Sequence, residues 1–262
     1  MNWFYIFALF LFGLPVGSFL NVVIWRLPRK ENVVFPPSHC PICNAKIRPY
    51  DNIPIISYLI LGGKCRDCGA KISPRYPVVE LITALLFAVA LPLTGWTMSW
   101  DLLAALILTG TGIAIAAIDI EHRIIPDELS FGGLIAGVVL APLRAESFYG
   151  LLWGIVGAVS GAVLLFIVRI GGKALFRREA MGWGDVKLIA MIGVFVGWEG
   201  VLMTVFIASV IGTIGGIIGM ITSQKTRKDR EIPFGPYLIA AGIIVFYFGD
   251  KILKSYLSLF EF

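Results

Sequence analysis

The sequence predicts an all-α polytopic membrane protein with about eight transmembrane helices and one small polar domain between the first and second helices. Three observations support this fold class. The chain of 262 residues is 58% hydrophobic and only 15% charged, whereas soluble domains carry about 25% charged residues. Apolar runs of about 20 residues, the length that crosses a bilayer core of about 30 Å, recur along it. Its four cysteines all lie in one polar stretch, between positions 40 and 68.

The apolar runs divide the chain into a first transmembrane helix (1–25), a polar domain (26–77) and a seven-helix membrane core (78–262). The first run follows no basic segment and is long enough to span, so we expect no cleavable signal peptide. The helices are expected at 3–25, 78–95, 101–118, 128–144, 149–168, 186–198, 200–222 and 233–255. The sixth covers only about 21 Å at 1.5 Å per residue. A short or broken helix beside an acidic residue is typical of a segment that lines a cavity.

Lys and Arg are unevenly distributed along this pattern. With eight helices, the loops after helices one, three, five and seven share one side of the membrane and hold 19 of the 22 basic residues. The other three are Arg144, Lys251 and Lys254. By the positive-inside rule, the basic loops and the polar domain are cytoplasmic and both termini lie outside. The main effect of this excess of Lys and Arg is to set the orientation of the helices in the membrane. The same residues can also attract anionic lipid.

The cysteines form two pairs, Cys40-Pro41-Ile42-Cys43 and Cys65-Arg66-Asp67-Cys68, separated by 21 residues. Each pair presents two thiolates to one metal, and two pairs complete a tetrahedral set with no open position. We therefore expect a structural zinc ion. Two disulfides are the alternative, disfavoured because cytoplasmic thiols stay reduced. A segment of about 50 residues builds little core, so metal binding supplies folding energy here.

Two aspartates stand at the ends of apolar helices. Asp119 directly follows seventeen uncharged residues, and Asp185 lies in Gly182-Trp183-Gly184-Asp185-Val186-Lys187. Gly182 and Gly184 let the backbone bend and another chain approach. An ionisable residue at membrane depth is costly and indicates function. Both aspartates are expected at the cytoplasmic face. The alternative for Asp119 is a buried ion pair with Lys187 or Arg123.

Three further polar residues are candidates near the same face. Ser18 and Asn21 lie three residues apart and share one side of the first helix. They serve either hydrogen bonding between helices or contact with substrate. Glu80, expected in the first turn of the second helix, either complements the helix dipole or is a functional acid.

The chain resembles the type IV prepilin peptidase family, membrane aspartic proteases of the GxGD kind that also N-methylate their product. The resemblance covers essentially the whole chain. Its motifs are Gly17-Ser18-Phe19-Leu20-Asn21 with Arg26-Leu27-Pro28, the two Cys-x-x-Cys pairs, Pro77-Val78-Val79-Glu80-Leu81, Ile118-Asp119 with Ile125-Pro126-Asp127, Gly182-x-Gly184-Asp185-Val186-Lys187, and Pro233-Phe234-Gly235-Pro236. A bare GxGD occurs by chance in many proteins, but this ordered set is specific.

The resemblance implies that Asp119 and Asp185 are the catalytic pair. It implies a substrate with a short basic leader that ends in Gly, cleaved at the cytoplasmic face of a bacterial inner membrane. Two carboxylates held close share one proton, because both cannot ionise cheaply. The ionised one activates water and the protonated one donates to the carbonyl oxygen, with neither assigned to a particular residue.

The resemblance also implies methyl transfer from S-adenosylmethionine to the new amino terminus. No Gly-rich strand-to-helix fingerprint of a nucleotide-binding fold is present. Asn21 and Glu80 are the candidates for this second reaction.

Other classes are less well supported. The sequence has no HExxH of a zinc protease and no GxSxG of a serine hydrolase, and nothing in it indicates nucleic-acid binding. A transporter or a scaffold with a zinc-knuckle docking domain is the alternative. Against a transporter, no internal repeat is evident and the aspartates lie near one face, not the midplane.

Overall fold

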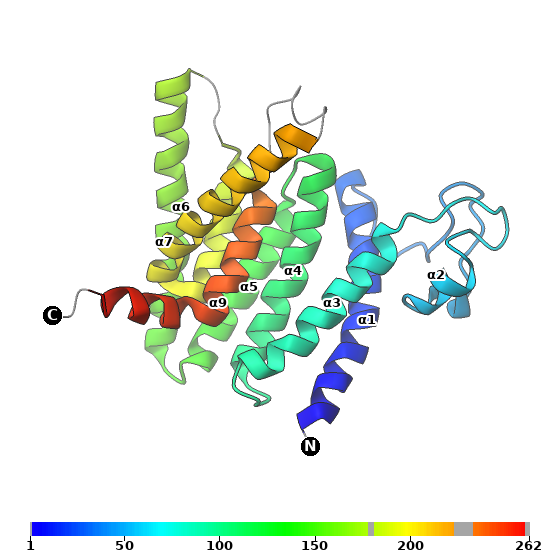
Figure 1. Cartoon of the computed structure of the whole chain (residues 1–262), viewed down its shortest axis with the longest axis horizontal. Helices are drawn as coiled ribbons and strands as arrows, with labels where there is room; N and C mark the ends of the chain where they lie inside the picture. Colours follow the sequence, from blue (N-terminus) through cyan, green and yellow to red (C-terminus); the bar gives the residue numbers. More distant parts are fainter. Residues whose placement is uncertain (1, 178–180, 223–232, 260–262) are drawn as a thin grey trace. The chain divides into compact units, whose positions relative to one another are not determined.

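The computed structural model describes residues 2–177, 181–222 and 233–259, and its regular elements there are helices with two isolated β-bridges (Figure 1). The predicted all-α class is confirmed for this part of the chain. The chain divides into two compact units, Met1–Met98 and Ser99–Phe262.

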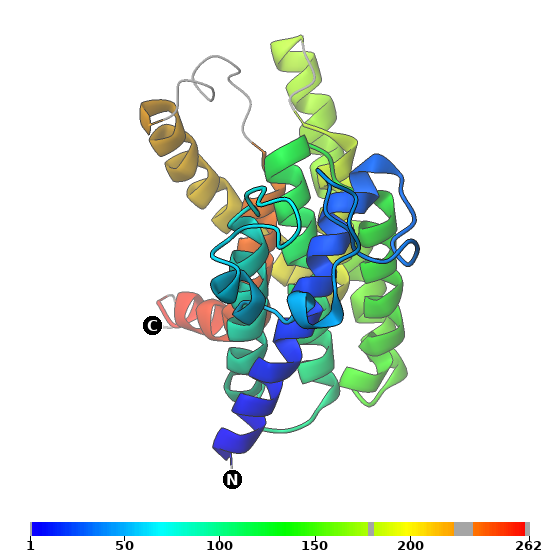
Figure 2. The same ribbon diagram turned by 90° about the vertical axis from the view of Figure 1, so that its right-hand side faces the viewer.

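The N-terminal unit is built on two helices, α1 (Asn2–Arg26) and α3 (Arg75–Leu93), which pack along each other (Figure 2). A Cβ atom on Gly17 would lie 2.6 Å from the Cα of Glu80, so the two backbones meet without intervening side chains. Between these helices the chain forms η1 (Leu27–Arg29), η2 (Pro49–Asn52) and the short helix α2 (Ile56–Ile60).

Helix α3 begins at Arg75, earlier than expected, and Glu80 therefore lies in its second turn. The prediction of Glu80 in the first turn, where it would complement the dipole, was wrong. The helix was expected to begin at 78, after Pro77, but the first four N–H groups of a helix have no partner within it. A proline there costs no hydrogen bond, so the helix runs through it.

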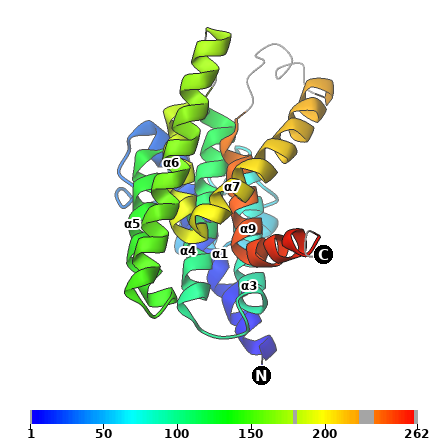
Figure 3. The same ribbon diagram turned by 90° about the vertical axis from the view of Figure 1, so that its left-hand side faces the viewer.

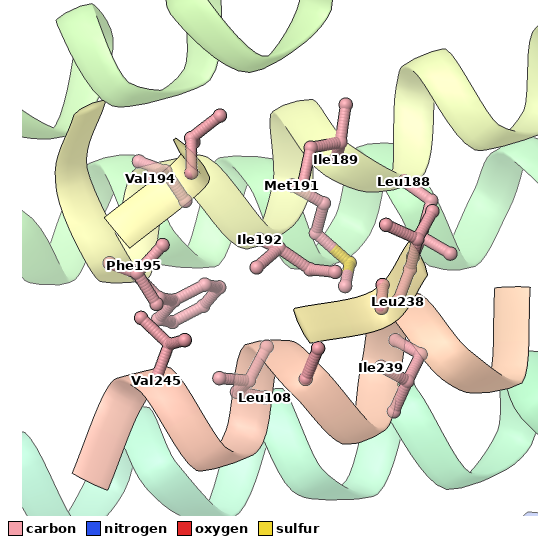
Figure 4. Close-up of a cluster of buried hydrophobic side chains, with 14 of the residues drawn as sticks. Leu108, Leu188, Ile189, Met191, Ile192, Val194, Phe195, Leu238, Ile239 and Val245 are labelled. Carbon is pink, nitrogen blue, oxygen red and sulfur yellow. The ribbon is translucent and has the colours of Figure 1, made fainter. Parts of the chain in front are cut away.

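The C-terminal unit comprises α4 (Trp100–His122), α5 (Asp127–Arg144), α6 (Phe148–Phe176), α7 (Trp183–Thr222) and α9 (Gly235–Leu257). Helix α7 packs against α5, α6 and α9, and α4 packs against α5 and α9 (Figure 3). Their common core contains Leu108 from α4, Ile192 and Phe195 from α7, and Leu238 from α9, all fully buried (Figure 4).

Helix α7 is interrupted at Gly197, which has φ 71° and ψ 178°, a backbone conformation that glycine adopts without steric cost. The expected sixth and seventh helices are thus two parts of one kinked element. The carbonyl of Phe195, two residues before the break, accepts a hydrogen bond from another helix. Arg144 supplies it from α5, with an N–H···O distance of 2.9 Å, and its Nε also pairs with Asp101 at 2.7 Å.

Among the described residues, six helices are long and apolar enough to cross a membrane: α1, α3, α4, α6, α7 and α9. Helix α5, expected as the fourth span, is formed but is not one of these six. The chain thus has the apolar helices of a membrane protein, and the count of eight spans stays a prediction.

Candidate active site and metal centre

Asp119 lies in the last turn of α4 and is only 5% exposed. The helix ends there because Arg123 adopts a left-handed conformation and its N–H bonds to the carbonyl of Asp119 at 2.9 Å. The carboxylate Oδ2 accepts a hydrogen bond of 3.0 Å from the backbone N–H of Gly235, the first residue of α9. A carboxylate at a helix N-terminus is favoured by the unpaired N–H groups and by the helix dipole.

Asp185 lies at the opposite end of its own helix, in the first turn of α7. Its side chain is partly buried and accepts a hydrogen bond from the backbone amide of Gly182. It lies close enough to Asp119 for the two carboxylates to interact electrostatically. The structure therefore brings together both predicted catalytic residues, which are 66 positions apart in the chain.

Ile125 packs at the start of α7, which carries Asp185, and at the start of α9, whose first N–H bonds to Asp119. A Cβ atom on Gly184 would lie 2.9 Å from the Cβ of Ile125, and one on Gly235 would lie 3.4 Å from its Cδ1. The same Cβ on Gly235 would lie 2.6 Å from Oδ2 of Asp119. The two glycines thus leave the space that Ile125 and the carboxylate occupy, a role the sequence did not reveal for Ile125 or Gly235.

Arg169 of α6 holds the turn that precedes α7. In the sequence, Arg169 was only one of the basic residues that indicate the orientation in the membrane. Its Nε donates to the carbonyl of Met181 at 3.1 Å, and its guanidinium lies 4.4 Å from the ring centre of Trp183. Trp183 also packs against Phe166, with 5.7 Å between the ring centres. These contacts fix the backbone on both sides of Gly182, next to Asp185.

Lys187, expected in the loop of the site, forms an ion pair of 2.5 Å with Asp127 at the start of α5. Its ammonium also lies 5.9 Å from the ring centre of Phe131. The suggested buried pair between Lys187 and Asp119 is therefore wrong. Lys187 follows Asp185 by two residues, and side chains at that spacing do not share a helix face.

The four cysteines gather at one point in the N-terminal unit. All are free thiols, and their sulfur atoms lie within 4.8 Å of one another. The Sγ atoms of Cys40 and Cys68 are 3.9 Å apart. Zinc bound tetrahedrally by thiolates at about 2.3 Å requires a separation of about 3.8 Å. The cluster therefore fits a four-thiolate metal ion, and the disulfide alternative is wrong for this structure.

The two cysteine knuckles are copies of one nine-residue pattern, 39–47 and 64–72, which share Cys, Cys, Ala, Lys and Ile at the same positions. In the first, Cys40 N–H bonds to Ala45 O at 2.9 Å; in the second, Cys65 N–H bonds to Ala70 O at 2.8 Å. A residue with positive φ, Asn44 or Gly69, follows each second cysteine. The prediction of a metal cluster rested on the cysteines alone and did not include this short repeat.

The pKa values of two thiols in the cluster, Cys40 and Cys68, are shifted in opposite directions. The backbone amide of Cys43 outweighs burial and lowers the pKa of Cys40 to about 7. The amide of Ala70 acts in the same direction on Cys68, but burial and hydrogen bonds from the other three thiols raise its pKa to about 12. Neighbouring thiols resist ionising together, and a divalent cation would remove that resistance.

The candidates for methyl transfer lie in the N-terminal unit, at the interface between α1 and α3. Asn21 is 1% exposed, and its Nδ2 donates to the carbonyl of Tyr76 on α3 at 3.0 Å, which confirms the expected hydrogen bond between helices. Ser18 is hydrogen-bonded to Glu80. Glu80, 7% exposed, accepts from the backbone N–H of Ile55 at 2.8 Å, so it joins α3 to the segment that carries the cysteines.

Comparison with protein families matches two models to this chain. Residues 11–93 match the bacterial peptidase A24 N-terminal domain, and residues 106–217 match the type IV leader peptidase family. The boundary between these matches agrees with the two structural units.

Curated proteins similar to the chain carry consistent names. A prepilin leader peptidase/N-methyltransferase of Aeromonas salmonicida (strain A449) is 39% identical over 98% of this chain and 96% of its own. A protein of the same name from Pseudomonas aeruginosa is 40% identical over 95% and 92%. The type 4 prepilin-like proteins leader peptide-processing enzyme of an Escherichia coli strain is 39% identical over 90% and 91%. The comparison with solved structures found no match.

Proposed function

Because the chain belongs to the type IV leader peptidase family, we propose that it removes the leader from type IV prepilins or pseudopilins and then methylates the new amino terminus. Peptidase activity follows from the family, and the identity of the catalytic residues is our proposal. The observation that carries it is the convergence of Asp119 and Asp185 at two helix N-termini.

The two aspartates act as an acid/base pair on a water molecule. They share one proton, since adjacent carboxylates cannot both ionise cheaply. The ionised carboxylate takes a proton from water while the water oxygen bonds to the carbonyl carbon of the leader's last Gly, and the protonated carboxyl donates to the carbonyl oxygen. The C–N bond then breaks, and the leaving amine takes a proton from the pair. The amides of Gly235 and Gly182 hold the two carboxylates in place while the proton moves. General acid/base catalysis of this kind contributes about 10²–10⁴-fold.

We propose that zinc occupies the four-thiolate cluster of Cys40, Cys43, Cys65 and Cys68. The ion is structural, because four protein ligands fill its coordination shell. It would fold the segment between α1 and α3 and would take no part in peptide hydrolysis.

The second reaction is assigned to the N-terminal unit. S-adenosylmethionine supplies the methyl group, and the acceptor is the amine that cleavage releases. Asn21 and Glu80 are the proposed residues. The Oδ1 atom of Asn21 is buried and has no hydrogen-bond partner among the described residues, which leaves an acceptor free for a donor group.

We infer that the site and the cysteine segment face the cytoplasm of a bacterial inner membrane, with both termini outside. The distribution of Lys and Arg supports this orientation. The alternative of a transporter or scaffold is not favoured, because relatives along nearly the whole chain are named as peptidases.

The deciding experiment measures cleavage of a prepilin-like substrate by the wild type, Asp119→Asn and Asp185→Asn in membranes or detergent. Both variants should lose cleavage by at least about a hundredfold. Asp127→Asn is the matched control, a carboxylate of the same unit that pairs with Lys187. Full cleavage by either Asp119→Asn or Asp185→Asn, in folded protein, would remove that residue from the mechanism.

The methyl-transfer assignment is tested separately on product that has already been cleaved. Asn21→Ala and Glu80→Gln should yield unmethylated amino termini while the leader is still removed. Normal methylation in both variants would place the second reaction elsewhere.

A further inference from the structure

Helix α2 presents its apolar side to the outside and its polar side to the protein. Ile56, Leu59 and Ile60 occupy one helical face and are 53%, 70% and 74% exposed. Ser57, on the other side, is 6% exposed; its hydroxyl donates to the carbonyl of Tyr50 at 2.9 Å. A water-soluble surface helix has the reverse arrangement. Exposed apolar patches of this kind mark a contact with a partner or a membrane.

A pocket with two lysines adjoins the C-terminal end of this face. It has a volume of about 420 Å³ and is lined by Tyr58, Gly62, Gly63, Lys64, Lys71 and Ser73, with two further residues. The two lysines face each other across an isolated antiparallel β-bridge. Two ammonium groups and the Tyr58 and Ser73 hydroxyls on its walls provide donors for an anionic group.

Lys64 and Lys71 have no acidic partner in the part of the chain that the structure describes. The neighbouring arginines are already paired: Arg66 binds Asp51 at 2.6 Å and Arg48 binds Asp67 at 3.5 Å. The positive charge of the pocket is therefore not neutralised within the segment.

One contact within the N-terminal unit ties α2 to the first part of a candidate membrane span. Glu80 is five residues inside the candidate span Arg75–Leu93, which is about 7.5 Å along the helix axis. Its carboxylate binds the N–H of Ile55, the residue immediately before α2, at 2.8 Å. In Figure 1, α2 lies to the side of α3, nearer to the N-terminal end of α3 than to its C-terminal end.

The backbone at Ile55 is strained to allow this placement. Ile55 has φ 61° and ψ −51°, a region that a β-branched residue adopts only with steric strain. Ile55 also makes the hydrogen bond to Glu80. It immediately precedes α2, whose apolar side chains are exposed.

We propose that the apolar face of α2 and the adjoining lysine pocket together bind the anionic phospholipid surface of the membrane that holds the chain. Ile56, Leu59 and Ile60 enter the boundary between headgroups and acyl chains, as amphipathic interfacial helices do to about 5–10 Å. Lys64 and Lys71 receive the phosphate of an anionic headgroup. This surface is separate from the carboxylate site and does not depend on the proposed cleavage reaction.

The test measures amide hydrogen exchange of residues 53–61 in the full-length, metal-loaded protein. The protein is placed in nanodiscs of phosphatidylcholine alone or of phosphatidylcholine with phosphatidylglycerol. A lysine near an anionic surface contributes about 1 kcal/mol, or about fivefold. We therefore expect phosphatidylglycerol to slow this exchange by up to about 25-fold.

Because the two knuckles are repeats, a lysine of the first knuckle provides a matched control for the lysines of the pocket. Lys64→Gln with Lys71→Gln should abolish the effect of phosphatidylglycerol. Lys46→Gln, at the position equivalent to Lys71 in the first knuckle, should leave it intact. Bound metal per chain is measured for each variant, and Lys64→Arg with Lys71→Arg, which keeps the charge, should retain the protection.

The outcomes separate lipid from other occupants. Equal exchange in the two lipid compositions would overturn the proposal, as would full protection in the Gln pair or equal loss in Lys46→Gln. Protection that appears only when a prepilin peptide is added would also overturn it, because the occupant would then be a peptide. Loss of the phosphatidylglycerol effect in the Gln pair alone supports it.

Discussion

The two functional regions of this protein are assembled in opposite ways. The cysteine cluster uses two local copies of a nine-residue turn, and each copy positions its sulfurs through hydrogen bonds within itself. The carboxylate site uses the ends of three helices, α4, α7 and α9, whose residues are up to 116 positions apart. A local pattern can be recognised from spacing, whereas a convergence of helix ends depends on packing along the whole unit.

The strongest way to test the local assembly is to remove the metal. Structural zinc contributes about 10–16 kcal/mol in small zinc-finger peptides, and the segment has little other core. A chelator should abolish exchange protection of the amides of Cys40, Asn44, Cys65 and Gly69. Helices of the C-terminal unit should keep theirs in the same hydrogen-exchange measurement. Protection that survives in metal-free protein would show that the knuckles fold by themselves, and added zinc should restore any that is lost.

The long-range assembly is tested at Gly235. In Gly235→Ala, the new methyl group would meet Oδ2 of Asp119 at 2.6 Å. The end of a side chain can move aside, so the fold should survive, but the carboxylate is displaced. A misplacement of about 1 Å costs about a hundredfold in rate, and the cleavage rate of the purified variant measures it. Gly132→Ala, whose Cβ meets no atom within 4 Å, is the control. Equal rates in the two variants would contradict the proposed geometry.

A smaller effect is expected at the break of α7. Arg144→Lys keeps the charge near Asp101 but removes the fork that also reaches the carbonyl of Phe195. An unsatisfied buried carbonyl costs about 1–3 kcal/mol, so the thermal unfolding midpoint should fall. Asp101→Asn, which leaves the bond to Phe195 intact, should lower it less. The reverse order would mean that the ion pair, and not the capped carbonyl, stabilises the break.

The smallest effect is expected for the ion pair of Lys187 and Asp127. Both side chains are partly exposed, at 31% and 55%, and such pairs contribute about 0–1 kcal/mol. A double-mutant cycle with Lys187→Met and Asp127→Asn should give a coupling within that range. Cleavage should change by less than about fivefold, the equivalent of ~1 kcal/mol. If Lys187→Met alone abolished cleavage, Lys187 would belong to the reaction and not to the rim of the site.

The sequence predicted what local chemistry determines. The cysteine spacing indicated a four-thiolate cluster, and the apolar runs indicated helices. Asp119 and Asp185 were recognisable because charge is rare at the end of such runs. The sequence did not predict the partners of these residues. Ile125, Gly235 and Arg169 contribute steric fit, a backbone N–H and a bond to a carbonyl, and none of these leaves a compositional signal.

The errors had a similar origin. An ion pair with Lys187 was one alternative role for Asp119, but the structure pairs Lys187 with Asp127 at the start of α5. Glu80 was placed in a first helical turn because the helix was expected to begin at 78, whereas it begins at Arg75. In both cases the packing of neighbouring helices, and not the type of the single residue, determines the position and partner of the side chain.

The bond from Gly235 to Asp119 has a consequence for genetics. Its donor is a main-chain N–H, which every amino acid except proline also carries. A screen that changes one side chain at a time would report Gly235 as intolerant of bulk. It would never show that the backbone N–H at this position also donates a hydrogen bond to the carboxylate. A backbone ester at this position, introduced by chemical ligation, would remove the donor and keep the shape, and would reveal what a genetic map of the site conceals.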